Sequence, residues 1–152
     1  MLEKIQRRLG QGSKFLLALR NSNRGNLPPT TLPEGCLYGT AEFNGFDFQN
    51  TSMEHVGSNR KLYIGDLAVR QDARRLGIAM SLLHTIESYA FQNGFDELYL
   101  HVETFNEPAR RLYRKHGFLE QPATQHVSNF TEQLLNRPAD SFSLMCKRLW
   151  TK

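Results

Sequence analysis

Hydrophobic and polar positions alternate along the chain in ways that predict both strands and helices. Apolar positions at every second residue, or short apolar runs, predict strands over residues 14–20, 36–48, 62–70, 97–104 and 141–149. The period becomes helical over residues 75–92 and again from Pro108 to Gly117. Strand, helix, strand and helix in this order predict a crossover between two parallel strands, and the earlier strands predict an antiparallel part. We therefore expect an α/β fold whose sheet is mixed, as in α+β proteins, with helices packed on it. We expect a single domain over residues 1–152.

Two segments give weaker signals. Asn44-Gly45 is a dipeptide typical of a two-residue hairpin turn, and we expect the chain to reverse there. The polar segment between Phe118 and Ser141 shows no period that favours a helix or a strand, so no element is predicted for it.

The third predicted strand contains an irregularity. Leu62 and Ile64 alternate on one face, but the next apolar pair, Leu67 and Val69, is out of phase with them by one residue. The slip falls at Gly65-Asp66 and predicts a β-bulge. A bulge kinks a strand and leaves backbone groups available to something other than a neighbouring strand.

Composition and charge exclude several classes of protein. The 152 residues are 39% hydrophobic, which supplies one core and is too apolar for a disordered chain. No apolar run approaches the roughly 18 residues of a transmembrane segment. Two cysteines, without a Cys-x-x-Cys or a dense Cys/His cluster, predict neither a disulfide scaffold nor a metal site. A net charge of +4 suits a polyanionic small ligand but, without a basic motif, predicts no nucleic-acid partner.

The start of the central helix has the composition of an anion-binding site. Gly77 and Ala79 are small enough to let a ligand approach the main chain. The first N–H groups of a helix have no helical partner and lie at the positive end of its dipole, so they bind phosphate groups. Arg74 and Arg75 add positive charge. Small residues at a helix start also serve packing alone, and this segment by itself does not choose between the two interpretations.

A second motif gives this segment a more specific interpretation. Arg-x-x-Gly-x-Ala, from Arg74 to Ala79, is followed by Asn-x-x-Ala-x-x-Leu-Tyr-x-x-x-Gly-Phe, from Asn106 to Phe118. The combination resembles the Gcn5-related N-acetyltransferase (GNAT) superfamily over about residues 62–119, the expected cofactor-binding core. The resemblance implies a GNAT-like acyl-CoA N-acyltransferase fold with acetyl-CoA as co-substrate. In that fold a bulge splays two parallel strands apart, and the pantetheine arm lies between them.

The resemblance also implies which residues bind the cofactor. It places backbone groups of the bulged strand on pantetheine, the helix start on the pyrophosphate, and Asn106 on the cofactor's arm. The full set is Leu67, Ala68, Val69, Arg74, Arg75, Leu76, Gly77, Ile78, Ala79, Asn106 and Tyr113.

Three residues match catalytic positions of the family. Tyr113 matches the tyrosine that faces the CoA sulfur and acts as general acid. Tyr63 and His101 match residues beside the acceptor amine in N-terminal protein acetyltransferases, the subgroup closest in site pattern, and a neutral His accepts a proton near pH 7. Structural interpretations stay open, with Tyr113 as a packed core tyrosine and His101 as a histidine on a sheet face. Asp66 and Glu103 are further candidates for the base.

The resemblance implies an N-acetyltransferase that moves an acetyl group from acetyl-CoA to a primary amine, at a protein N-terminus or a lysine. The family usually has a strand and two helices before the segment matched to residues 14–20, and only 13 residues precede it here, so we expect a fold shortened at the N-terminus. This departure leaves an alternative, a catalytically weak or inactive GNAT-fold protein that serves as a binding or scaffold subunit of a larger assembly. Aromatic residues between Tyr38 and Phe48 are the candidate interface. We expect a soluble intracellular protein, and the sequence does not choose between cytoplasm and plastid stroma.

Overall fold

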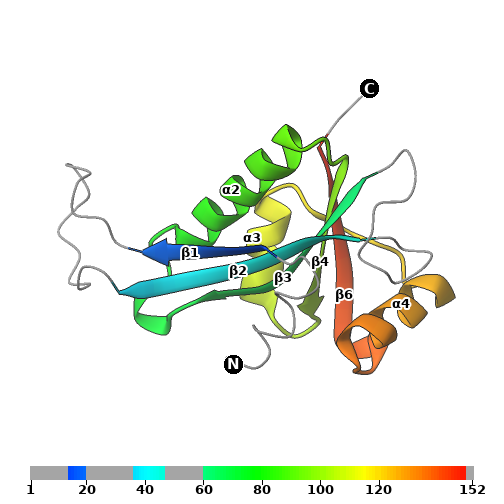
Figure 1. Ribbon diagram of the computed structural model, residues 1–152. Helices are drawn as coiled ribbons and strands as arrows, with labels where there is room; N and C mark the ends of the chain where they lie inside the picture. Colours follow the sequence, from blue (N-terminus) through cyan, green and yellow to red (C-terminus); the bar gives the residue numbers. More distant parts are fainter. Residues whose placement is uncertain (1–13, 20–35, 47–59, 150–152) are drawn as a thin grey trace.

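A computed structural model describes residues 14–19, 36–46 and 60–149 of the chain (Figure 1). The described strands are β1 (Lys14–Leu19), β2 (Leu37–Phe46), β3 (Lys61–Val69), β4 (Glu97–Glu103), β5 (Leu119–Glu120) and β6 (Phe142–Arg148). The described helices are α2 (Ile78–Gln92), α3 (Glu107–Lys115) and α4 (Gln125–Leu135), with short 3-10 turns η1 (Gln71–Ala73) and η2 (Ala139–Ser141).

The described strands form one mixed sheet of six strands in the order β1-β2-β3-β4-β6-β5. The central pair, β3 and β4, is parallel, and every other neighbouring pair is antiparallel. Helix α2 connects the two parallel strands, as the order of the sequence signals required. The predicted α/β fold with a mixed sheet is confirmed.

Helices cover both faces of this sheet. Successive strand residues point to opposite faces, so Leu98 and Leu100 of β4 enter a core with α2 and α3, while Tyr99 enters a second core with α4. Figure 1 shows α2 lying along the sheet and α4 beside β6. Of the candidate catalytic side chains, Tyr63 lies on the face under α4, whereas Tyr113 belongs to the core on the α2 and α3 face.

Helices α2 and α3 pack on the same face of the sheet, and α2 begins at Ile78, three residues later than the helical period predicted. The stripe of α2 is buried at Leu82, Leu83, Ile86 and Ala90. Helix α3 begins after Asn106, whose side chain accepts a hydrogen bond from the Ala109 N–H at 3.3 Å.

Helix α4 occupies the segment for which the sequence predicted no element. Thr124 caps it by accepting a hydrogen bond from the Val127 N–H at 3.3 Å, and it ends at Asn136, which has a φ of 52°. Its apolar positions Val127, Phe130 and Leu134 follow a helical spacing and pack on the sheet.

Two further expectations concern the amino-terminal third. The turn expected at Asn44-Gly45 is wrong, because both residues lie within β2 and pair with Tyr63 and Leu62 of β3. The expected shortening of the fold concerns residues 1–13, which lie outside the described part of the chain.

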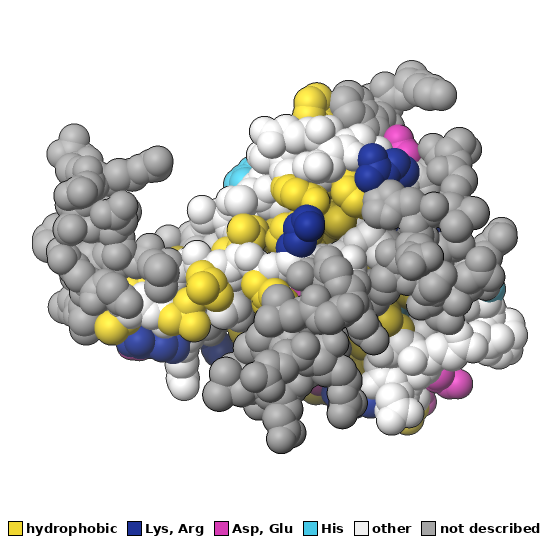
Figure 2. Space-filling view, viewed as in Figure 1, with side chains coloured by type: hydrophobic (Ala, Val, Ile, Leu, Met, Phe, Trp, Pro, Cys, Tyr) yellow, Lys and Arg dark blue, Asp and Glu magenta, His cyan; other side chains and the backbone are white. Residues whose placement is uncertain are grey.

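The described edge of the sheet is partly apolar on its surface. Figure 2 shows hydrophobic side chains over β1 and between β1 and α2. Leu17 of β1 is 59% exposed. In contrast, Tyr38 and Phe43, two aromatic residues of the expected interface, are buried, so they offer no exposed aromatic surface to a partner.

Candidate active site

Strand β3 is irregular where the sequence predicted a bulge. Two residues of β3, Asp66 and Leu67, lie opposite the single residue Ala41 of β2. Asp66 has a φ of 36°, which is far from the conformation of an ordinary strand. The predicted bulge is therefore confirmed, and it increases the local bend of β3.

The parallel strands β3 and β4 separate at this bulge. Their pairing ends at Ile64 opposite Leu100, although β3 continues to Val69 and β4 continues to Glu103. We call the space between these diverging ends the strand gap. The backbone of residues 67–69, expected to contact pantetheine, lies on its β3 side. Beyond Ile64 and Leu100 the two strands are therefore not paired with each other, at the place where the sequence predicted that pantetheine would lie.

The chain enters α2 through two residues with positive φ. Arg75 has a φ of 66°, and Gly77, the residue that caps α2, has a φ of 80°. No described side chain caps this helix end by a hydrogen bond. Within the described residues, no atom outside its immediate neighbours lies within 4 Å of where a Cβ on Gly77 would stand. The first-turn amides of α2 are consequently accessible to a negatively charged group.

The other residues expected at the diphosphate surround this helix start. Arg74, Arg75 and Leu76 are exposed, whereas Ile78 and Ala79 are half-buried, and Ile78 packs against the core. The Nε of Arg74 donates a hydrogen bond to the Val69 carbonyl at 3.3 Å, which ties the loop to the end of β3. The strand gap and an accessible helix start therefore follow each other directly along the chain, an arrangement that fits a pantetheine arm followed by a diphosphate.

Tyr113 and Asn106 lie on the next helix, α3. Tyr113 is 7% exposed, packs edge-on against Phe118, and belongs to the core shared with α2. Burial raises the pKa of its hydroxyl to about 12, so the group is protonated at neutral pH. Asn106 uses its side-chain oxygen as the cap of α3, and this leaves its amide N–H₂ for other partners.

Tyr63 and His101 meet on the opposite face of the sheet, beside the point where β3 and β4 separate. The Tyr63 hydroxyl lies 2.9 Å from His101 Nδ1. The other ring nitrogen, Nε2, lies 2.8 Å from Thr131 Oγ1 of α4. Thr131 donates its single hydroxyl proton to the Val127 carbonyl at 2.8 Å, so toward His101 it can only accept. This assigns the Nε2–H tautomer to a neutral His101 and leaves the Nδ1 lone pair to accept from Tyr63.

The surroundings of His101 keep its ring neutral. The ring stacks on Phe130 at a centroid distance of 5.7 Å and meets Phe142 edge-on at 6.5 Å. Burial lowers the pKa of His101 from 6.5 to about 4, because the charged form is poorly solvated there. His101 is thus an unprotonated imidazole throughout the neutral range.

This pKa predicts a pH-dependent stability. Between pH 6.5 and about 4 the unfolded chain binds a proton at His101 and the folded chain does not. The neutral His101 ring therefore makes its full contribution to the free energy of unfolding above pH 6.5. This contribution, about 3 kcal/mol at most, is lost as the pH falls through about 4. Urea unfolding of the wild type and of His101→Gln near neutral pH and near the lower pKa measures it. The wild type should lose more free energy of unfolding on acidification than the variant, and equal losses would contradict the assignment.

Thr131 and Phe130 are site residues that the sequence did not predict. They come from α4, inside the segment without an assigned element, and their contacts with His101 depend on how α4 packs across the sheet. The available signal was the helical spacing of Val127, Phe130 and Leu134 after Thr124.

The two further candidates for the base take other positions. Glu103 accepts from Arg137 at 3.5 Å, and its side chain is 33% exposed. Asp66 is the residue with positive φ in the bulge and is exposed. Neither is buried as deeply as His101, which stays the candidate base.

The comparison with protein families identifies the class. The model of the acetyltransferase (GNAT) family matches residues 6–118. The chain therefore belongs to the GNAT acetyltransferase family, whose acyl donor is acetyl-CoA. None of the helices in the described part of the chain is long and apolar enough to cross a membrane.

Individual relatives support this family over part of their length. A segment of 67 residues, 44% of the chain, is 42% identical to GCN5-related N-acetyltransferase 6, chloroplastic, of Arabidopsis thaliana, and covers 23% of that protein. A segment of 67 residues, 43% of the chain, is 37% identical to N-alpha-acetyltransferase 50 of Danio rerio and covers 40% of it. The chain thus spans less than half the length of these relatives.

The fold also matches solved structures. A chain in the crystal structure of the NatC complex bound to Gag peptide and CoA aligns with a TM-score of 0.63 at 20% identity. The alignment covers 90% of this chain and 71% of that one. At this identity the likeness supports the fold.

Proposed function

We propose that the chain is an acetyl-CoA-dependent N-acetyltransferase that acts on a protein amine, with an N-terminal α-amine favoured over a lysine. One observation carries the proposal: the strand gap, the proposed cofactor site, begins beside the hydrogen-bonded pair of Tyr63 and His101. A cofactor site alone would suit any member of the family. The pair adds a route for the proton that an amine has to lose.

The cofactor site consists of main-chain groups and the start of α2. Backbone groups of residues 67–69 bind the pantetheine arm in the strand gap, and the first-turn amides after Gly77 bind the diphosphate. Arg74 and Arg75 add positive charge at the same helix start. Acetyl-CoA, when bound, supplies a thioester whose carbonyl carbon an amine attacks.

Tyr63 and His101 remove the proton of the attacking amine. Amines of proteins have pKa values of about 8 to 10.4, so at neutral pH an acceptor arrives mostly protonated. The Nδ1 atom of His101 accepts a hydrogen bond from Tyr63, and the Tyr63 oxygen can in turn accept from the amine or from a water molecule. Transfer along this pair leaves a neutral nitrogen for the new C–N bond, and His101, whose pKa burial lowers to about 4, holds the proton only transiently before it passes to solvent.

Tyr113 supplies the proton that the departing sulfur takes when the C–S bond breaks. Its raised pKa keeps the hydroxyl protonated, and its buried position on α3 excludes water from the transfer. The substitution Tyr113→Phe removes only this hydroxyl. We expect kcat to fall by about tenfold or more, with the dissociation constant of acetyl-CoA almost unchanged.

Steady-state rates and calorimetric titration of the same Tyr113→Phe protein provide this test. A matched control is Tyr89→Phe, which removes a hydroxyl from α2 away from the strand gap and should leave both quantities unchanged. A Tyr113→Phe protein with the wild-type rate would remove the general-acid role from this residue.

The proposed activity is tested by titrating acetyl-CoA calorimetrically and then following thiol release with peptides and small amines. Peptides with a free N-terminal amine should give the fastest release, and N-terminally blocked peptides that contain lysine should be slower. Cofactor binding without turnover of any acceptor would favour the alternative, a scaffold subunit that keeps the fold. Of the aromatic residues on which that alternative rests, Tyr38 and Phe43 are buried, and the side chains of Phe46 and Phe48 lie outside the described part of the chain.

A further inference from the structure

A second cluster of ionisable side chains lies between α2 and the end of α3, away from the Tyr63 and His101 pair. It consists of His84 and Glu87 on α2 and His116, which follows α3. Each of the three offers one ligand atom, and these atoms all lie within 4.8 Å of one another. The sequence predicted no metal site because it has no paired cysteines, but folding brings these separated residues together.

His116 supplies the most informative atom of this cluster. Its side chain is 2% exposed, and its Nε2 lies 3.1 Å from Glu87 Oε2 in the geometry of an ion pair but makes no hydrogen bond to any described residue. On the other side of the ring, Nδ1 lies 3.1 Å from the sulfur of Met80, which can only accept. In the tautomer that carries the ring proton on Nδ1, the Nε2 lone pair faces Glu87 Oε2.

In that tautomer, a cation bound between Nε2 and Oε2 would contact both atoms. Lys147 donates to the other carboxylate oxygen, Glu87 Oε1, at 2.6 Å. The ion pair with Lys147 fixes the orientation of the Glu87 carboxylate, as hydrogen-bond partners do for carboxylates that bind metals. It leaves Oε2 facing the two histidines.

We propose that His84, Glu87 and His116 form a binding site for Zn²⁺. Two imidazoles and one carboxylate are a ligand set typical of zinc sites that keep an open position for water. With zinc–ligand bonds of about 2.0 to 2.2 Å, tetrahedral ligand atoms stand about 3.4 Å apart. The observed separations to Glu87 Oε2 are 3.1 Å from His116 and 3.9 Å from His84, on either side of that value.

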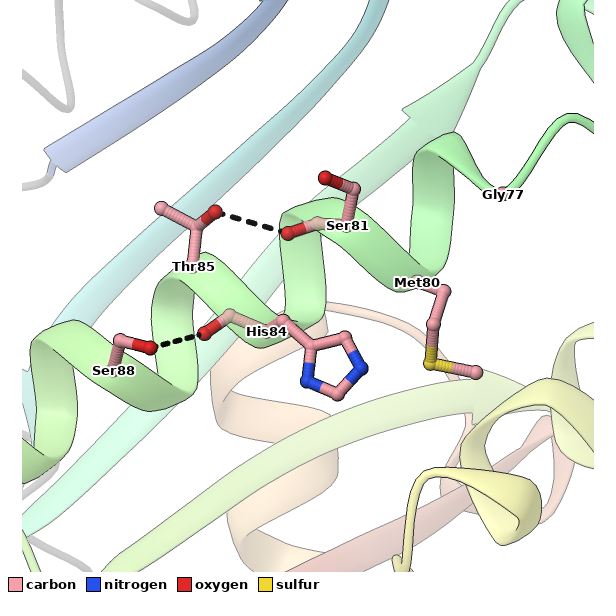
Figure 3. Close-up of a pocket in the computed structure, with 6 residues that line it drawn as sticks. All are labelled: Gly77, Met80, Ser81, His84, Thr85 and Ser88. Atoms are coloured by element: carbon pink, nitrogen blue, oxygen red, sulfur yellow. Dashed lines mark hydrogen bonds between the residues drawn. The ribbon is translucent and has the colours of Figure 1, made fainter. Parts of the chain in front are cut away.

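The surface above the cluster leaves room for the remaining coordination positions. His84 is 66% exposed, so its ring can rotate onto an ion at little cost. Figure 3 shows His84 and Met80 side by side along the outer face of α2. They line a shallow hollow of about 440 Å³, together with Gly77, Ser81, Thr85 and Ser88. A zinc ion here would join α2 to the end of α3.

Calorimetric titration of the untagged, chelator-treated protein with zinc sulfate tests this site. We expect one equivalent of Zn²⁺ to bind and the midpoint of thermal unfolding to rise with zinc concentration. His84→Ala removes an exposed ring without disturbing the core, and should weaken zinc binding at least about tenfold and abolish most of the thermal shift. Glu87→Gln, which keeps the shape of the side chain, should also weaken binding.

His126→Ala is the matched control, because it removes an exposed histidine of α4 outside the cluster. It should bind zinc like the wild type. No stoichiometric binding to the wild type, or undiminished binding to His84→Ala, would overturn the proposal. Loss of binding in His126→Ala would equally overturn it by placing the zinc elsewhere.

Discussion

Gly77→Asp is expected to abolish measurable binding of acetyl-CoA. The space around a Cβ at this position is open among the described residues, so the new side chain would enter the region proposed for the diphosphate rather than clash with the protein. A carboxylate about 4 Å from a phosphate charge costs about 4 kcal/mol at the effective dielectric constant of a protein surface. That cost corresponds to a loss of affinity of about a thousandfold. Isothermal titration of the variant with acetyl-CoA measures it.

The control for this prediction is Gly77→Asn. Gly77 has a φ of 80°, and Asn and Asp share the same backbone cost and nearly the same size in that conformation, but Asn is uncharged. We expect both variants to have similar unfolding midpoints and Gly77→Asn to bind acetyl-CoA much more tightly than Gly77→Asp. An aspartate variant with full affinity would show that the diphosphate lies elsewhere. Equal losses in both variants would assign the effect to backbone and bulk.

Tyr63→Phe is expected to lower kcat by about a hundredfold or more, within the range found for removal of a general acid or base. The substitution deletes one hydroxyl and keeps the ring in the core with Phe130 and Tyr99. We expect this loss because the Tyr63 hydroxyl makes a hydrogen bond of 2.9 Å to His101, so that the two side chains form a single route for the proton. The KM for acetyl-CoA should change little, because the cofactor contacts belong to the strand gap and α2. Steady-state kinetics at saturating cofactor provide the measurement.

Combining Tyr63→Phe with His101→Gln tests whether the two residues act together. If the proton passes through both, the double variant should be about as slow as the slower single variant, since removing a second member of a broken route changes little. Two losses that multiply would indicate independent roles.

Tyr99→Phe is the matched control for Tyr63→Phe, because both substitutions remove a tyrosine hydroxyl on the same face of the sheet. Its hydroxyl donates to Glu97 at 2.8 Å rather than to His101, so we expect a nearly normal kcat. A Tyr63→Phe protein that turns over as fast as Tyr99→Phe would contradict the proposed route.

The features of the site that lie within one strand or one turn could be predicted from the sequence. The phase slip at Gly65-Asp66 correctly indicated the bulge, because a bulge changes which residues share a face. The alternation along β4 correctly placed His101 opposite the buried Leu100, since side chains of a strand alternate. These patterns depend only on neighbouring residues, so they predict the structure correctly when the surrounding elements form as expected.

Features that depend on packing between distant elements could not be predicted in this way. Thr131 reaches His101 across 30 positions of sequence, and nothing in the spacing of the two indicates their contact. The turn signal at Asn44-Gly45 failed because pairing of β2 with β3 continues through both residues, so tertiary pairing overrode a local preference. His116 and Glu87 show the same limit, since only the packing of α3 against α2 brings them together.

The central claim is that the strand gap and the start of α2 bind the cofactor together. Amide hydrogen exchange, resolved by residue and recorded with and without CoA, tests it most directly. We expect slower exchange in residues 67–69 of β3 and in the first turn of α2 after Gly77, with smaller changes in the rest of the described sheet. Unchanged exchange at both segments under saturating CoA, or protection confined to other elements, would contradict it.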